Sequence, residues 1–341
     1  MNANSDEMIN HSILLIHPGK ASFVRKDIEI LKKYFSVKDF YYHPSKQLFP
    51  NIISQSKLLI WLLYNLVKAK AVYIWFADYH SFLPIFFSRL LRKKSILVLG
   101  GYDVANIPEL KYGSFYKPLR AFCAAYSIRN SYYVIAVDQT LIDKAKILVK
   151  DIKGKLLVIP TGYNSDYWKR FHHKEKFVLN VGIIDIPERM KIKGIDFLLE
   201  VAKLMPSYQF VIIGFSNPDS AFIPSMPNVK YLPKLTQDLV REYYSRAKVY
   251  VQFSITEGFP NVVCEAMLCE CIPVGASVNG VPTAIGDCGF LLEDRDPEKA
   301  AQLIKKALES PTTLGEKARQ RIMTLFTEEN RESQLLSILK S

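Results

Sequence analysis

Two glutamates on either side of a Gly-Phe-Pro turn form the stretch of the sequence best suited to chemistry. In SITEGFPNVVCEAM, Glu257 precedes the turn and Glu265 lies about one turn inside the helical pattern that follows. Gly258 lets the backbone approach a ligand closely, and Pro260 suits the first helical turn, where its missing N–H costs nothing. The N–H groups that a helix start leaves unpaired, with the helix dipole, predict a diphosphate site. The residues of this expected site are Gly258, Phe259, Pro260, Asn261 and Val262.

The two glutamates are too far apart in sequence to be the acid and nucleophile of a glycosidase. In retaining glycosidases the two carboxyl groups lie about 5 Å apart. Between Glu257 and Glu265, even a helical rise of about 1.5 Å per residue amounts to about 12 Å. We therefore interpret them as two contacts to different parts of one long ligand. The alternative is a plain helix start without a ligand.

The elements that must position these residues are short apolar runs alternating with helical patterns. The runs are almost continuously apolar, as are strands buried on both faces of a parallel sheet. The expected strands are 12–18, 72–78, 95–101, 132–138, 156–162, 177–183, 208–214, 229–234, 248–254, 272–277 and 289–293, and the clearest helices are 25–35, 194–205, 236–247 and 296–310. This alternation, present in both halves of the chain, predicts two doubly wound α/β domains, with ligands beyond the carboxyl ends of the strands.

The polar segment 164–176 separates the two halves, which predicts a first domain over 1–170 and a second over 171–326. Two such sheets facing each other would form an interdomain cleft. The final stretch, 327–341, begins with Thr327 followed by acidic residues, which favours a helix start. This helix has no strand after it, so it either packs on the surface or crosses back to the first domain.

The positive charge of the chain is concentrated in its first half. The net charge is +12, but residues 1–175 hold 26 Lys and Arg against 13 Asp and Glu. An excess of this kind indicates an anionic partner such as nucleic acid, a membrane surface or a phosphorylated substrate, or else it serves only solubility. Basic residues lie beside apolar ones in 88–94, 111–120 and 167–171, which would suit an anionic membrane or a lipid diphosphate.

No segment is long enough to cross a bilayer, and the first ten residues lack the pattern of a signal peptide. The apolar stretch 57–70 fits a buried crossover helix better than one lying on a membrane. The five cysteines form no CxxC pair and are expected to be reduced thiols of a cytoplasmic protein. Asp294 and Asp296 resemble a metal-binding DxD, but Asp296-Pro297 is a good helix start, so we expect no metal and no cofactor.

EGFPNVVCEAM resembles the E-x7-E signature of family 4 retaining glycosyltransferases, with Glu257 and Glu265 at the expected spacing. Further similar segments in the same order are 99–104, 158–168, 193–202 and 270–301, so the resemblance extends over nearly the whole chain. The resemblance implies the GT-B fold, in which two Rossmann-like domains face a cleft. It implies transfer of a sugar, with retention of configuration, from a UDP- or GDP-linked donor to a glycan or lipid-linked acceptor. The setting would be the synthesis of cell-surface polysaccharide or glycolipid, in the cytoplasm or peripherally on the inner face of the membrane.

By the same resemblance, Glu257 would hold hydroxyls of the donor sugar and Glu265 the ribose hydroxyls. Backbone N–H groups at 258–261 would hold sugar and phosphate oxygens. Lys193 would neutralise the diphosphate leaving group, on which negative charge develops. We find no convincing general base in the sequence, and the leaving phosphate itself would serve as one.

The sequence departs from the family pattern at two places. The usual Arg is replaced by Ile183, so Arg189 or Lys191 would have to substitute for it. In LGGYDV, which contains Asp103, Gly100 stands where the family has His. His80 would supply the missing contact in the acceptor part of the site, although a single His after a strand is more often structural. Gly19, which follows the first strand, either allows a close approach to a ligand or forms an ordinary turn.

These departures leave a second interpretation open, a non-catalytic relative that keeps the scaffold and binds a glycan or a protein. Nucleic-acid binding is a third hypothesis that rests on charge alone. The sequence contains no helix-turn-helix, RNP or zinc-finger pattern, so we expect no nucleic-acid partner.

Overall fold

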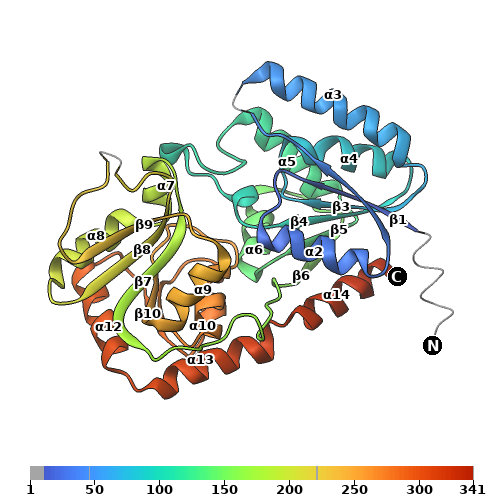
Figure 1. Ribbon diagram of the computed structural model, residues 1–341. Coiled ribbons are helices and arrows are strands. Elements are labelled where there is room, and N and C mark those ends of the chain that lie inside the picture. The colour runs from blue at the N-terminus through green and yellow to red at the C-terminus, as the bar shows by residue number, and fades with distance from the viewer. Residues whose placement is uncertain (1–10, 46, 220–221, 341) are drawn as a thin grey trace, which may run out of the picture. The chain divides into compact units, whose positions relative to one another are not determined.

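The computed structural model describes residues 11–45, 47–219 and 222–340 and divides into two compact units (Figure 1). Met1–Pro160 and Glu332–Ser341 form the first unit, and Thr161–Arg331 form the second. The division falls after Pro160, earlier in the chain than the boundary expected at 170, and the end of the chain is grouped with the first unit. Each unit contains one six-stranded sheet.

The sheet of the first unit is parallel throughout and has the order β2-β1-β3-β4-β5-β6. Its strands are β1 (Ser12–His17), β2 (Ser36–Tyr41), β3 (Ala69–Trp75), β4 (Lys94–Leu99), β5 (Tyr133–Ala136) and β6 (Lys155–Val158). Five of them confirm strands expected from apolar runs. The pattern missed β2, because an edge strand need not be buried on both faces and its residues are exposed or half-buried.

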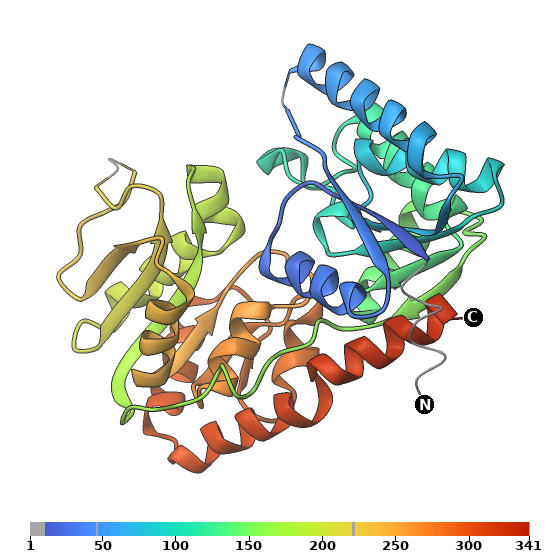
Figure 2. The same ribbon diagram turned by 45° about the vertical axis from the view of Figure 1, so that its right-hand side comes forward.

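Helices cover both faces of this sheet. They are α2 (Ser22–Lys32), α3 (Leu48–Asn65), α4 (Tyr79–Leu90), α5 (Pro118–Asn130) and α6 (Gln139–Leu148). A row formed by α3, α4 and α5 lies on one face, and α2 lies on the other (Figure 2). This follows from right-handed crossovers, because the chain moves one way across the sheet from β1 to β2 and the opposite way from β2 through β5.

The expectation that 57–70 forms a buried crossover helix is wrong for one side of α3. The inward side is covered, since Leu58 and Leu62 have no exposed surface. On the outward side, however, Ile60 is 67% exposed, Leu63 63% and Tyr64 86%. The sequence is apolar on both sides of this helix, so hydrophobicity alone could not distinguish the side that faces the protein.

The sheet of the second unit is also parallel and has the order β12-β11-β10-β7-β8-β9. Its strands are β7 (Glu175–Ile184), β8 (Gln209–Phe215), β9 (Val229–Pro233), β10 (Ala247–Gln252), β11 (Ile272–Ala276) and β12 (Phe290–Leu292), all at expected positions. The chain builds outward from β7 to β9 and then returns to the other side of β7 with β10. The order therefore reverses between β7 and β10, and ligands of such sheets bind beyond the strand ends at this point.

The remaining helices are α7 (Pro187–Ile192), α8 (Ile195–Leu204), α9 (Gln237–Arg246), α10 (Asn261–Leu268), α11 (Gly280–Ile285), α12 (Pro297–Glu309), α13 (Thr312–Leu325) and α14 (Glu328–Lys340). The expected helix starts are confirmed by their caps. Asp296 accepts hydrogen bonds from the N–H groups of Glu298 and Lys299, and the Thr327 hydroxyl accepts one from Asn330. Among the described residues, no helix combines the length and hydrophobicity that crossing a membrane would require.

Candidate functional site

Lys193 and Glu257 lie together beyond the strands where the second sheet reverses its order. Lys193 follows β7 through the short helix α7, and Glu257 follows β10. The Lys193 ammonium donates a hydrogen bond of 2.7 Å to Glu257 Oε1. Both side chains keep contact with solvent, at 27% and 13% exposure. The structure thus brings together the two residues that the resemblance assigned to the sugar and to the leaving group.

Glu257 Oε1 also accepts two further hydrogen bonds, from Gln252 Nε2 at 2.8 Å and from the Ser254 hydroxyl at 2.8 Å. Among the described residues, the other carboxylate oxygen has no partner. Gln252 is itself oriented by the Tyr250 hydroxyl, which donates to its Oε1 at 2.9 Å. Burial raises the pKa of Tyr250 well above its usual value, so the hydroxyl keeps its proton. The carboxylate is therefore fixed by side chains that alternate along β10 and its following loop.

Backbone contacts hold the Lys193 turn against the loop that carries Glu257. The Ile255 N–H donates to the Ile192 carbonyl at 2.9 Å. Gly194 has a φ of +67°, and a β-carbon there would lie 1.9 Å from the Phe253 carbonyl oxygen. Only glycine allows this combination of backbone conformation and contact. The sequence Lys-Gly therefore serves to place the ammonium group beside the carboxylate.

A third loop, after β11, supports the Glu257 turn from another side. Asn279 Nδ2 donates to the Glu257 carbonyl at 2.5 Å, and the Gly280 N–H donates to the Gly258 carbonyl at 3.1 Å. A β-carbon at Gly280 would lie 2.5 Å from that same carbonyl oxygen. Asn279, Gln252 and Ser254 were not identified from the sequence as site residues. Gln252 and Ser254 lie within the expected strand 248–254. They are polar residues at alternate positions of an otherwise apolar run, and this was the available sign that both side chains point to the same side.

The helix that carries Glu265 begins at Asn261, one residue after Pro260, which occupies the N-cap position. The Asn261 side chain is already engaged, because its Oδ1 accepts hydrogen bonds from Thr161 at 3.0 Å and from Tyr163 at 2.7 Å. Phe259 is 4% exposed and packs on Phe326, with ring centroids 4.9 Å apart. These side chains therefore stabilise the turn. Because the Val263 N–H donates to the Pro260 carbonyl at 3.0 Å, the N–H groups of Asn261 and Val262 are what remains for a ligand.

The other predicted residues of this turn are placed as follows. Gly258 and Pro260 are buried, Val262 is half-buried, and Glu265 is 9% exposed on α10. Arg189 lies on α7 and pairs with Asp185 at 3.1 Å. The Lys193 backbone N–H donates to the Arg189 carbonyl at 2.9 Å, but among the described residues no hydrogen bond or ion pair joins the Arg189 side chain to the side chain of Lys193 or of Glu257. Ile183 is 51% exposed, and Lys191 is exposed as well.

In the first unit, the sheet reverses its order between β1 and β3, and Gly19 and His80 follow these two strands. His80 is 2% exposed, and its Nε2 lies 2.8 Å from the Trp75 carbonyl oxygen. Burial lowers its pKa, so the ring stays neutral. Gly19 is half-buried, and a β-carbon there would meet nothing within 4 Å. His80 is thus placed as a core histidine. At Gly19 no neighbouring atom requires a glycine, so the residue fits an ordinary turn.

Asp103 is buried completely and holds the loop after β4. It accepts hydrogen bonds from the N–H groups of Gly100, Gly101 and Ala77. Burial raises its pKa to about 7 against the opposing effect of these donors. A β-carbon at Gly100 would lie 2.4 Å from the ring of Phe76. This aromatic ring therefore fills the space beside the position at which the family has a histidine.

Sequence reasoning missed His17 at the end of β1. The side chain is completely buried, and neither ring nitrogen has a hydrogen-bond partner among the described residues. Its Nε2 lies 3.6 Å from Asp39, which pairs with Lys20 at 2.8 Å. Its position directly after the four apolar residues 13–16 was the available signal in the sequence.

Groups that could hold a metal ion are absent from the described residues, since no three His, Cys, Asp or Glu side chains lie together. Asp296 serves as the N-cap of α12, and Asp294 pairs with Lys299. The five cysteines are buried free thiols.

Comparison with known proteins agrees with the geometry of the second unit. Residues 175–310 match the family model described as glycosyl transferases group 1. One subunit of the phosphatidylinositol N-acetylglucosaminyltransferase from Arabidopsis thaliana is 27% identical over 186 residues, which cover 51% of this chain and 41% of that protein. The capsular polysaccharide biosynthesis glycosyltransferase CapM from Staphylococcus aureus is 24% identical over 265 residues, covering 68% and 66%. N-acetyl-alpha-D-glucosaminyl L-malate synthase from Bacillus anthracis is 29% identical over 237 residues, covering 62% and 60%.

Together these matches support a family 4 glycosyltransferase. They span about two fifths to two thirds of the length of these curated relatives. Solved structures confirm the expected GT-B fold. Sucrose-phosphate synthase from Thermosynechococcus elongatus superimposes with a TM-score of 0.80 at 18% identity, covering 97% of this chain and 98% of that one. HepE from Anabaena, in complex with UDP and glucose, gives 0.71 at 17% identity, covering 97% and 99%.

Proposed function

We propose that this protein is a family 4 retaining glycosyltransferase that moves a sugar from a nucleotide-sugar donor to a glycan or lipid-linked acceptor. The observation that carries the proposal is the Lys193–Glu257 pair at the point where the second sheet reverses its order. A relative that kept only the scaffold would not need a carboxylate held by three donors while it remains open to solvent. The similarity to CapM and to the phosphatidylinositol N-acetylglucosaminyltransferase subunit supports a role in cell-surface polysaccharide or glycolipid synthesis.

In this proposal the donor lies across the start of α8, which follows Lys193, and the start of α10, which follows Glu257. Glu257 binds hydroxyls of the transferred sugar through the carboxylate oxygen that no described residue occupies. The first-turn N–H groups of α10 bind phosphate oxygens, and Glu265 binds the ribose. Lys193 stabilises the charge that develops on the departing diphosphate, because its ammonium is fixed beside the site before the reaction begins.

A UDP-linked donor is the first candidate, because two structures of HepE contain UDP with glucose or UDP-glucose. A GDP-linked donor is the alternative. We propose that no metal takes part, because Lys193 supplies the cation and Asp296, the best candidate ligand, caps a helix. We further propose that the enzyme works in the cytoplasm, peripherally on the inner face of a membrane, without a nucleic-acid partner.

The test is transfer from labelled UDP- and GDP-sugars to a lipid extract used as a pool of acceptors. Glu257→Ala should abolish transfer while the thermal midpoint stays close to that of the wild type. Glu175→Ala is the matched control, since Glu175 also pairs with a cation, Arg246, but at the start of β7. It should retain activity. Full activity of Glu257→Ala would overturn the proposal.

The second candidate is a non-catalytic relative that binds a glycan or a protein. Ile183 and the Phe76 ring beside Gly100 favour it, because they remove two contacts that the family usually makes. It predicts that the wild type turns over no donor even with a rich acceptor pool, while still binding a glycan or protein.

A further inference from the structure

The outward side of α3 exposes a row of apolar side chains that Ser56 interrupts midway. Its members recur at the spacing that places them on one side of a helix, opposite the buried Leu58 and Leu62. We call these residues the α3 stripe: Phe49, Ile52, Ile53, Ile60, Leu63, Tyr64 and, just beyond the helix, Val67. Each is between 41% and 86% exposed. Apolar residues scattered singly over a surface are ordinary, but seven gathered along one side of a helix indicate an interaction site.

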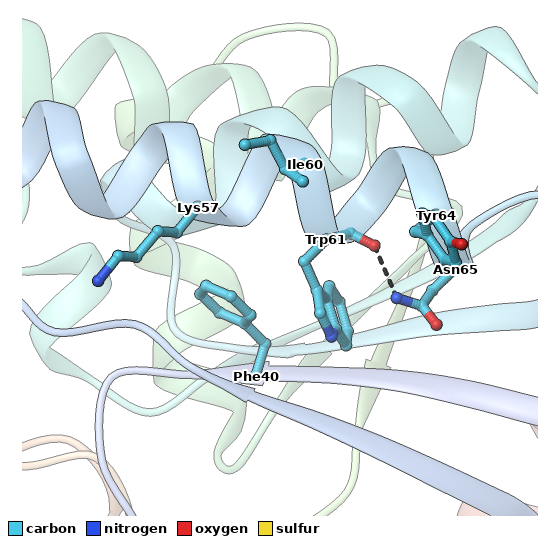
Figure 3. Close-up of a pocket in the computed structure, with 6 residues that line it drawn as sticks. All are labelled: Phe40, Lys57, Ile60, Trp61, Tyr64 and Asn65. Carbon is cyan, nitrogen blue, oxygen red and sulfur yellow. Dashed lines mark hydrogen bonds between the residues drawn. The ribbon is translucent and has the colours of Figure 1, made fainter.

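A pocket of about 480 Å³ adjoins the stripe on the side that faces β2. Phe40 from β2 and Trp61 from α3 form its floor, with ring centroids 5.2 Å apart, and Lys57, Ile60, Tyr64 and Asn65 complete it. Figure 3 shows the Trp61 ring directed toward the strand and Ile60 directed away from it. The stripe therefore continues into a shallow, open depression between α3 and β2.

The charges around the stripe have one sign. Residues 40–77 contain no Asp or Glu, whereas Lys57 and Lys68 stand on the exposed side of this segment. No described residue forms an ion pair with either lysine. The neighbouring helices α4 and α5, on the same face of the sheet, also expose apolar residues, among them Leu90 at 66% and Phe122 at 60%.

We propose that the α3 stripe is the surface by which this protein docks on an anionic lipid bilayer. An exposed apolar helix side bordered by lysines has the composition of helices that lie in the membrane interface. Lysines near such a surface are attracted to anionic headgroups. A second copy of the chain is a poorer occupant, because a symmetric dimer would bring the same lysines together with no acidic residue to oppose them. This inference rests on the proposed function, for which it supplies the route to a lipid-linked acceptor.

The test is flotation of the full chain with vesicles of phosphatidylcholine alone and with vesicles containing about one third phosphatidylglycerol. We expect binding to the anionic vesicles only. The double variant Ile60→Ser, Leu63→Ser should lose it. The matched control Ile147→Ser, Leu204→Ser removes an exposed Ile (81%) and an exposed Leu (51%) elsewhere and should bind like the wild type. The assay needs no turnover, so its failure would leave the transferase proposal intact, and inactivity of the enzyme would leave this proposal intact.

The lysines are tested separately. Lys57→Gln and Lys68→Gln should each weaken binding about fivefold at moderate salt, which corresponds to roughly 1 kcal/mol per cation near an anionic surface. Lys150→Gln and Lys153→Gln, on the loop between α6 and β6, are the controls. A fluorophore on Tyr64→Cys should shift its emission to the blue on anionic vesicles, and the same label on Ile147→Cys should not. The natural cysteines are buried and should not compete for the label.

Two results would overturn the proposal. Equal binding of the α3 variants and their controls would place the membrane contact elsewhere. Absence of vesicle binding, together with a concentration-dependent dimer that Ile60→Ser, Leu63→Ser disrupts, would identify a second copy as the occupant of the stripe.

Discussion

At the scale of single residues, the candidate site is a carboxylate that is fixed on one oxygen. Lys193, Gln252 and Ser254 all donate to Glu257 Oε1, and Gln252 is fixed in turn by Tyr250. Such fixation favours the binding of sugar hydroxyls in one orientation, because the Glu257 side chain loses less conformational freedom when the sugar binds. The supporting residues are therefore as informative about function as Glu257 itself.

Removing the two supporting side chains should have unequal consequences. Ser254→Ala leaves Glu257 with two donors and should cost about 1 kcal/mol of stability, with a fall in kcat. Gln252→Leu should cost more, about 1–3 kcal/mol, because it removes the three hydrogen bonds that the buried amide makes with Tyr250, Ser254 and Glu257. Denaturant unfolding and initial transfer rates measure both effects. Equal stability losses would show that the Gln252 amide does not orient the network.

At the scale of elements, the site depends on how three loops beyond the second sheet are joined. The Lys193 turn, the Glu257 turn and the Asn279 loop are linked by backbone hydrogen bonds and by contacts that only glycine permits. Loops held in this way act as one rigid support, although each follows a different strand. The crossing of β10 to the far side of β7 is what makes the first two of them neighbours.

Gly194→Ala should disrupt this support. The left-handed backbone conformation alone costs a residue other than glycine about 1–2 kcal/mol, and the new methyl group would collide with the Phe253 carbonyl. We expect a lower thermal midpoint and a loss of transfer activity. Gly182→Ala is the matched control, since its β-carbon would meet only Lys193 Cγ, at 3.9 Å. If both variants were equally stable, the close packing at Gly194 would not be required.

At the scale of the whole molecule, the two units should respond differently to a nucleotide. The residues that would bind the donor, Lys193, Glu257 and Glu265, all belong to Thr161–Arg331. The first unit supplies α3 and the buried His17 and His80 instead. We therefore expect the nucleotide to stabilise the second unit and the lipid surface to engage the first.

Thermal unfolding with UDP, GDP, ADP and CMP checks this division. A ligand at about 100 times its dissociation constant stabilises the native state by about 2.7 kcal/mol, which for units of this size is a shift of roughly 5–10 °C. Hydrogen exchange should locate the added protection in Thr161–Arg331. A shift with one nucleotide would identify the base. No shift with any of them would favour the non-catalytic relative.

The sequence by itself determined the class of fold and the position of the site in the chain. Continuous apolar runs specify strands buried on both faces, and a parallel sheet directs its ligands to the strand ends, so the sequence pattern singled out Glu257. Lys193 was assigned only through the resemblance to family 4 glycosyltransferases. Only the tertiary structure decided what surrounds them. Gln252, Ser254 and Asn279 are ordinary polar residues until strand pairing brings them to Glu257. The exposure of α3 was decided in the same way, because an apolar helix side carries no signal of whether another element will cover it.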